Sequence, residues 1–286
     1  MKIAASSYSY NRYLQNKTHT QFSLISLVKE MGFDAIEFSG IIPHDGSSPE
    51  EYAKKLKVES DRAGLEISNF CFGADFINCE DIDAEIQRVK KQIDIAEILG
   101  VKTVRHDATG GKLQGLTFDM ALPVLARSCR EITEYAAEKG IRTMVENHGY
   151  FCQDSSRVEK LVTAVNHPNF GLLCDMGNFL CADEDPAKAF GIVASYAFYV
   201  HAKDFHVKSV EGTDPGEGFF RSRNGNYLRG AIVGHGNVPI KTCLYALKRV
   251  GYDGFISIEF EGMEDNYEAM RIGLANLKRY IEEIGL

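Results

Sequence analysis

The sequence lacks the long apolar run that a helix needs to cross a bilayer. Its first eight residues turn polar too early for a secretory signal. It also has no basic stripe, and its net charge is −8, whereas proteins that neutralise many phosphates carry clustered lysine and arginine. These absences predict a protein that interacts with neither membranes nor nucleic acids.

No Cys-x-x-Cys pair occurs among the seven cysteines, which are odd in number and scattered along the chain. Cys71, Cys129, Cys174 and Cys243 lie within apolar patterns that are typical of small core residues. The cysteines therefore favour a reducing cytoplasm. The first apolar run is not followed by G-x-G-x-x-G, so the main signature of a dinucleotide-binding fold is missing too.

What the sequence does contain is an alternation of short apolar runs and longer stretches with helical spacing. Residues such as Ile86, Val89 and Ile93 recur at steps of three and four, as on one face of a helix. The alternation predicts a parallel sheet, and eight runs favour a closed (β/α)8 TIM barrel forming a single domain over 1–286, with an open doubly wound sheet as the alternative. The predicted strands are 2–8, 34–39, 66–73, 102–107, 142–148, 170–176, 197–204 and 255–261.

One segment, 205–238, has no clear period and is rich in glycine. Loops of this length are usually functional or disordered, and in a barrel this one would lie over the catalytic face. We weigh two roles for it, a mobile lid or a contact with a neighbouring subunit in a homo-oligomer, and a flexible surface insertion is the simpler alternative. If it is a lid, Arg229 is the best candidate to bind a substrate phosphate or carboxylate, because a guanidinium can do so bidentately.

Four polar residues end four apolar runs: Glu146, Asp175, His201 and Glu259. Any one of them alone would be an ordinary polar strand end. A buried carboxylate is costly unless it is paired or binds a metal, and the gaps between the four place them on consecutive strands. They therefore predict one divalent ion at the carboxyl ends of the fifth to eighth strands. Oxygen donors with one imidazole suit Mn²⁺, Mg²⁺ or Co²⁺, and Zn²⁺ is tolerated by the same atoms.

The motifs around these residues resemble those of the xylose isomerase-like TIM-barrel superfamily, and the resemblance covers the whole chain in element order. The motifs are Val145-Glu146-Asn147-His148-Gly149, Cys174-Asp175-Met176-Gly177-Asn178, Val200-His201-Ala202-Lys203-Asp204 and Ile258-Glu259-Phe260. The resemblance implies that the four residues are metal ligands and that Glu146 and Glu259 are the acid/base pair. Asn178 stands where ketose epimerases of this group place a substrate-facing histidine and where the endonuclease branch has a metal-binding one. That departure counts against both assignments.

Five further residues are candidates for the substrate pocket, each with a simpler structural alternative. His148 follows the strand of Glu146, and the amide of Asn178 can bind a substrate hydroxyl. Lys203 lies two residues beyond His201 and so points to the same side of the strand, where it can bind a substrate oxygen or pair with an acid. The last two, His106 and Glu37, end the fourth and second predicted strands.

The predicted function is that of a metal-dependent isomerase or epimerase of a small sugar or related polyhydroxy carbonyl compound. Glutamate would move a proton through a metal-stabilised cis-enediolate. One alternative is a metal-dependent dehydratase of a keto-inositol or a dehydroshikimate-like substrate, since the same enediolate can expel a neighbouring hydroxyl. A second alternative is a non-catalytic sugar-binding barrel, against which the four retained ligands argue.

Overall fold

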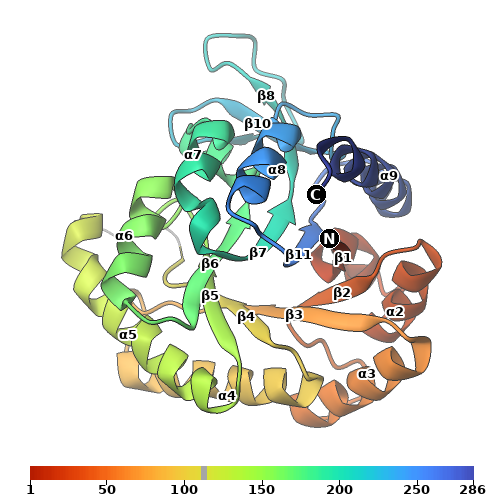
Figure 1. The fold of residues 1–286 in the computed structure, drawn as a ribbon, viewed down its shortest axis with the longest axis vertical. Coiled ribbons are helices and arrows are strands. Elements are labelled where there is room, and N and C mark those ends of the chain that lie inside the picture. The colour runs from red at the N-terminus through yellow and green to blue at the C-terminus, as the bar shows by residue number, and fades with distance from the viewer. Residues whose placement is uncertain (111–114) are drawn as a thin grey trace.

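The computed structural model describes residues 1–110 and 115–286, and at its centre eight parallel strands close into a barrel (Figure 1). The barrel closes where the first strand pairs with the last, with Ala4 opposite Ser257. Closure confirms the predicted TIM barrel and excludes the open sheet. The strands are β1 (Lys2–Ser6), β2 (Ala35–Ser39), β3 (Glu66–Phe72), β4 (Thr103–His106), β5 (Arg142–Glu146), β6 (Phe170–Asp175), β7 (Ala197–Ala202) and β11 (Phe255–Ile258).

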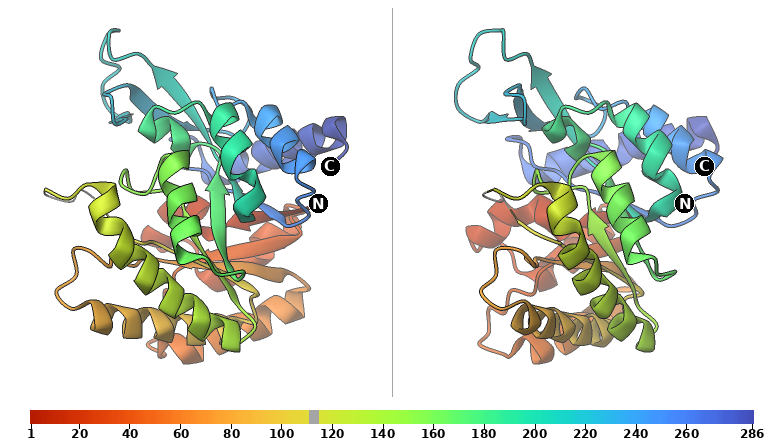
Figure 2. Two further views of the ribbon diagram at one scale, coloured as in Figure 1. Left: turned by 60° about the vertical axis from the view of Figure 1, so that its left-hand side comes forward. Right: turned by 90° about the vertical axis from the view of Figure 1, so that its left-hand side faces the viewer.

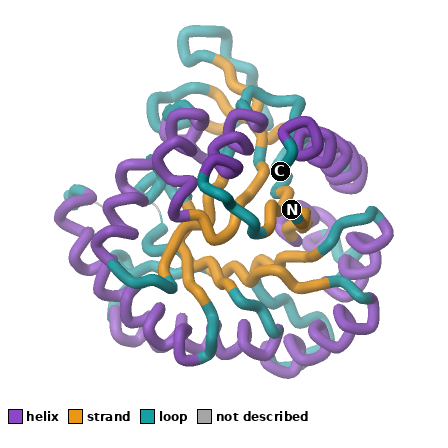
Figure 3. Tube along the Cα trace, viewed as in Figure 1, coloured by secondary structure: helices purple, strands orange, loops and turns teal. Residues whose placement is uncertain are grey.

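Helices surround the barrel on its outside (Figure 3). Their ends follow ordinary capping chemistry: the Asp81 carboxylate accepts the first backbone N–H groups of α4, and Gly100 ends that helix with φ 75°. The α-helices are α1 (Asn11–Gln15), α2 (Gln21–Glu30), α3 (Pro49–Ala63), α4 (Ile82–Leu99), α5 (Phe118–Glu138), α6 (Ser155–Val165), α7 (Pro186–Val193), α8 (Ile240–Arg249) and α9 (Asn266–Ile284). Short 3₁₀ helices occur at η1 (Ser7–Tyr10), η2 (Asn178–Ala182) and η3 (Ala194–Tyr196).

The main hydrophobic core lies between the strands and the helices, where the outward side chains of the strands meet the apolar faces of the helices. A smaller cluster of Cys71, Met144, Leu173 and Tyr199 fills part of the barrel interior. These side chains exclude water from the inside of the barrel, so polar groups that point inward near its carboxyl end are buried. No helix in the described part of the chain is long and apolar enough to cross a membrane.

The segment 205–238, predicted as one long loop, contributes to a small antiparallel sheet that projects from the barrel (Figures 1 and 2). Its strands are β8 (Asp204–Lys208), β9 (Phe220–Arg221) and β10 (Tyr227–Ala231), in the order β8-β10-β9. Two of the strands have five residues and one has two, too short for a clear alternating pattern. Gly230 lets β10 pass close to the barrel, since a Cβ there would lie 2.4 Å from the backbone carbon of Glu261.

Candidate metal centre

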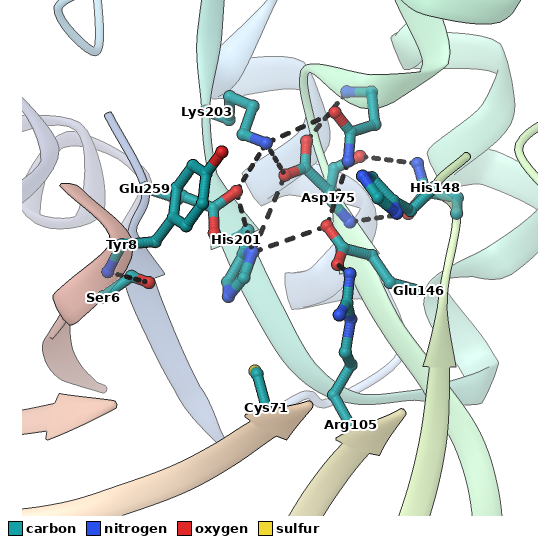
Figure 4. A network of polar contacts seen from close by, with 12 residues as sticks. Ser6, Tyr8, Cys71, Arg105, Glu146, His148, Asp175, His201, Lys203 and Glu259 are labelled. Carbon is teal, nitrogen blue, oxygen red and sulfur yellow. Dashed lines mark hydrogen bonds and ion pairs between the residues drawn. The ribbon is translucent and has the colours of Figure 1, made fainter. Parts of the chain in front are cut away.

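Four strand-end side chains meet at the carboxyl end of the barrel (Figure 4). Glu146 and Asp175 are the last residues of β5 and β6, His201 lies in β7, and Glu259 directly follows β11. The Nδ1 atom of His201 lies 3.6 Å from Glu146 Oε1, 3.7 Å from Asp175 Oδ2 and 3.6 Å from Glu259 Oε2. The structure therefore brings all four predicted ligands to one point.

Two of these atoms are buried without any hydrogen-bond partner: His201 Nδ1 and Asp175 Oδ2. The other oxygen of Asp175 is fully used, because it accepts the backbone N–H groups of Gly177 and Asn178 at 2.7 and 2.8 Å. A buried polar atom without a partner costs about 1–3 kcal/mol. Both atoms face the same gap between the four side chains. The distances from His201 Nδ1 to the three carboxylate oxygens are 3.6–3.7 Å. These distances are close to the edge of a tetrahedron whose metal–ligand bonds are about 2.1 Å long. The donor set thus fits a divalent cation.

The supporting contacts hold two of the four side chains in place. On its far side, His201 Nε2 lies 2.9 Å from the carboxylate of Glu37, which leaves Nδ1 free to face the gap. A carboxylate behind a ligating histidine fixes the ring and raises its basicity. Asn147 clamps the backbone of Asp175: its Oδ1 accepts the Asp175 N–H at 2.8 Å, and its Nδ2 donates to the Asp175 carbonyl at 3.0 Å.

A second group of possible donors, Glu37, Cys71 and His201, lies on the other side of the same imidazole. One neutral imidazole offers one lone pair, so His201 cannot serve both groups in that form. Burial raises the pKa of the Cys71 thiol well above its usual value, which disfavours the thiolate that a metal needs. The Glu37–His201 contact is therefore better explained as a hydrogen bond that supports the first group.

Two permanent cations contact this cluster. Lys203 Nζ lies 2.5 Å from Glu259 Oε2 and 3.3 Å from Asp175 Oδ2, and Arg105 forms an ion pair with Glu146 (Figure 4). In the described residues, the carboxylates that contact Lys203, Arg105 or His201 are Glu37, Asp107, Glu146, Asp175, Glu259 and Glu261. These carboxylates outnumber the cations even when His201 is protonated, so a divalent ion would offset surplus negative charge.

The pKa values of the cluster follow from this charge balance. Burial alone would raise the pKa of Glu259, but Lys203 and His201 lower it to about 2. Burial likewise opposes ionisation of Glu146, and Arg105 and His201 hold its pKa well below the usual value. Burial would lower the pKa of Lys203, but the surrounding carboxylates raise it well above its usual value. Both glutamates are therefore carboxylates at neutral pH, as metal ligands must be.

Two other predicted pocket residues lie beside the cluster. Asn178 is buried, and its Nδ2 donates to Glu146 Oε1 at 3.0 Å, so its amide orients the glutamate. His148 is half exposed, with Nδ1 3.5 Å from Asp107 Oδ1. Together with Lys203, His148 lines a cavity of about 150 Å³ above the four donors, and Tyr8, Arg105 and Glu261 also line it.

Three predicted pocket residues lie elsewhere. Glu37 is completely buried behind His201, with its carboxylate 2.9 Å from Nε2, and it lines no part of the cavity over the four donors. His106 points out of the barrel, because side chains alternate along β4 and Arg105 is the one that faces inward. The His106 side chain is completely buried there. Arg229 pairs with Glu264 at 3.3 Å on the small sheet and lines none of the described cavities near the cluster.

Sequence reasoning missed several residues of the cavity. Alternation along β4 puts Arg105 and His106 on opposite sides of the strand, but it does not say which of them faces inward. Glu261 lies two residues beyond Glu259, the same spacing that identified Lys203 from His201. Tyr8 follows β1 after a polar stretch, and nothing in its local pattern sets it apart from a surface residue.

Comparison with known proteins identifies the family. Residues 25–280 match the family model described as "Xylose isomerase-like TIM barrel", and the chain belongs to this family. Among curated relatives, an inosose dehydratase of Lacticaseibacillus casei is 24% identical over 222 residues, which cover 73% of each chain.

Solved structures with similar folds include an L-ribulose 3-epimerase and the IOLI protein with a zinc atom. The epimerase has a TM-score of 0.74 at 17% identity, covering 99% of this chain and 95% of the other. The IOLI protein has a TM-score of 0.76 at 16% identity, covering 99% of both chains. At these identities the structural likeness establishes the fold alone.

Proposed function

We propose that this chain is a divalent-metal-dependent isomerase or epimerase that acts on a small sugar or related polyhydroxy carbonyl compound. The proposal rests on two buried atoms that form no hydrogen bond, His201 Nδ1 and Asp175 Oδ2, although Lys203 Nζ lies 3.3 Å from the second. His201 Nδ1 faces oxygens of Glu146, Asp175 and Glu259 at 3.6–3.7 Å. Burying such atoms is unfavourable unless a cation completes the site. The cavity above them opens to a substrate of modest size.

In this proposal Glu146, Asp175, His201 and Glu259 hold the ion. When bound, a divalent ion would polarise the substrate carbonyl and offset the negative charge that develops on it. The donors suit Mn²⁺, Mg²⁺ or Co²⁺. A zinc-containing protein of the same fold makes Zn²⁺ a further candidate to test.

The proton would be moved by the two glutamates. Glu146 and Glu259 come from β5 and the end of β11, on opposite flanks of His201 in the barrel order, so they can reach a substrate carbon from two sides. Both are ionised at neutral pH because cations lower their pKa values, and a carboxylate can accept a proton from the carbon next to a carbonyl. The resulting enediolate takes the proton back at another position or face.

Neighbouring side chains would hold the substrate oxygens. Lys203 carries its charge into the cavity beside Glu259, and His148 offers a half-exposed imidazole at the rim. Arg105 and Asn178 both bind Glu146, so their proposed role is to fix the direction in which this base points.

The direct test is exchange of substrate carbon-bound protons with deuterium from solvent. A panel of ketoses, keto-inositols and keto-glycosides would be incubated with the protein and Mn²⁺, and exchange followed by NMR. Enolising activity predicts metal-dependent exchange in at least one member whatever the final product. A protein that holds no divalent ion and catalyses no exchange would instead fit the sugar-binding alternative.

A dehydratase is the second candidate, and the curated relatives support it, since the Lacticaseibacillus casei match is an inosose dehydratase. In that reaction the enediolate expels a hydroxyl from the next carbon, which needs a proton donor near the leaving oxygen. Lys203, His148 and Glu261 all line the cavity where such an oxygen would lie. Mass spectrometry separates the two reactions, because a dehydratase product has lost one water and an isomer has not.

A further inference from the structure

A second cavity adjoins the one above the four donors. Its volume is about 140 Å³, beside about 150 Å³ for the first, and the two share His148, Lys203 and Glu261 in their walls. Small-molecule sites usually have volumes of about 300 Å³ or more. Neither cavity alone reaches that size, whereas the two together approach it.

The second cavity differs from the first in its aromatic lining. Tyr150 and Phe220 are 40% and 39% exposed, and both face this cavity. The buried ring of Phe205 also lines it and meets the Phe220 ring edge-on at a centroid distance of 5.6 Å. Exposed flat rings beside a polar cavity are suited to cover the apolar face of a sugar ring.

These aromatic walls are fixed by bonds between the small sheet and the barrel loops. The Tyr150 hydroxyl donates to the Arg221 carbonyl at 2.7 Å, and Arg223 donates to the Tyr150 carbonyl at 2.5 Å. Arg223 also pairs with Asp154 at 3.1 Å. The backbone of Tyr150 lies in the left-handed region with φ 61°, a conformation that a tyrosine keeps only when its surroundings hold it there.

The turn that follows Phe220 is tied down from the other side by one carboxylate. Asp183 accepts hydrogen bonds from the Ser222 hydroxyl at 2.6 Å, the Asn224 backbone N–H at 2.6 Å and the Asn226 amide at 2.8 Å. Binding surfaces that are already ordered lose less entropy when a ligand binds. The wall of the second cavity is therefore built before the substrate arrives.

We infer that the substrate spans both cavities: its reacting carbons lie over the four donors, and a second sugar-like ring lies in the adjoining cavity against Phe220. The substrate class is then a glycoside or other ring-substituted polyhydroxy carbonyl compound, in preference to a free triose or pentose. Phe220 is the specificity-determining residue for this second ring. The inference rests on the proposed function, since it places the reacting end of the substrate in the metal cavity.

The test uses two probes without a carbonyl group, so binding is measured without turnover. myo-Inositol offers one ring, and galactinol offers the same ring carrying a galactose. Calorimetric titration of the Mg²⁺-loaded protein should show galactinol binding about tenfold or more tightly than myo-inositol, a difference of about 1.4 kcal/mol. Phe220→Ala and Phe220→Leu should remove this preference, because neither keeps the flat ring.

Phe219→Ala is the matched control, since it removes the adjacent ring, which lies against Arg229 and lines neither cavity. It should keep the preference for galactinol. Equal affinities in the wild type, no binding of galactinol, or a preference that survives in both Phe220 variants would overturn the inference. Titration of Mg²⁺ alone tests the metal site separately, so a protein that binds Mg²⁺ without preferring galactinol refutes only the two-ring substrate.

Discussion

The two mouths of the barrel place their charges differently. At the amino ends of the strands a cavity of about 320 Å³ is lined by residues such as Glu66, Arg142 and Phe255. The ion pairs there, such as Lys2–Glu66, are well exposed. At the carboxyl ends the cavity over the four donors measures only about 150 Å³, but His201 and Asp175 are buried there, each with an atom that forms no hydrogen bond.

Burial of charge, more than the size of a cavity, therefore marks the candidate site. An exposed pair such as Lys2–Glu66 is solvated and contributes about 0–1 kcal/mol. A buried carboxylate without enough partners is costly, and a fold keeps it only when something offsets that cost. In the described part of the chain, the groups of side chains arranged to hold a metal all include His201, at the carboxyl-end mouth.

We expect the largest loss of activity when either of the two glutamates at the carboxyl-end mouth is substituted. Glu146→Gln and Glu259→Gln should each lower the rate of solvent exchange by roughly 10²–10⁴-fold, since each removes a general base as well as a negative charge at the metal. Thermal unfolding should show that both variants still fold. Glu66→Gln at the amino-end mouth is the control, and near-normal exchange in either site variant would refute the acid/base assignment.

A smaller effect, on metal affinity, is expected for Glu37, whose carboxylate contacts the far side of His201. Glu37→Gln keeps the shape of the side chain but weakens the contact that orients His201, so the affinity for Mn²⁺ should fall by about 10–100-fold. Calorimetric titration with Mn²⁺ measures this without a substrate. Unchanged affinity would mean that Glu37 does not position the ligand.

The positions of the candidate site residues could be predicted only in part, because they depend on the side of the strand that each residue faces. The four predicted ligands end apolar runs in a chain of regular strand–helix units, so topology alone brought them to one mouth. Glu37 instead lies in the middle of β2, buried behind His201, and alternation along β4 places His106 outside the barrel. Choosing Arg105 over His106 needed the register of β4, which short apolar runs do not reveal.

The small sheet over 205–238 was beyond prediction for a related reason. Its strands are short, and its position depends on contacts that are distant in sequence. Asp204 illustrates this: its carboxylate accepts the backbone N–H groups of Gly234, Gly236 and Val238 at 2.8–3.0 Å. In the sequence nothing separates this carboxylate, three residues after His201, from a site residue, whereas in the structure it holds a loop.

The outer face of β4 carries another buried titratable group, since His106 has no exposed surface. Burial lowers the pKa of His106 from 6.5 to about 4, so the unfolded chain binds a proton at a pH where the folded protein does not. Stability should therefore fall as pH drops below 6.5, by about 2 kcal/mol between pH 7 and pH 5 from this residue. Urea unfolding of the wild type and His106→Gln at both pH values measures the contribution, and an equal loss in both proteins would refute it.

The smallest effect is expected for Arg229, which lies away from both mouths. The sequence suggested that Arg229 binds a substrate phosphate or carboxylate, and in that case Arg229→Lys would selectively weaken binding of an anionic substrate. Its pairing with Glu264 on the small sheet instead predicts equal and minor changes in KM for anionic and neutral substrates, with a stability loss below about 1 kcal/mol. A selective rise in KM for the anionic substrate would restore the earlier hypothesis.

The most direct measurement is an anomalous difference map from crystals of the Mn²⁺-loaded protein. We expect a peak about 2.0–2.3 Å from His201 Nδ1 and from carboxylate oxygens of Glu146, Asp175 and Glu259. A peak between Glu37, Cys71 and the Nε2 atom of His201, or no peak at the carboxyl-end mouth after saturation with Mn²⁺, would contradict this expectation.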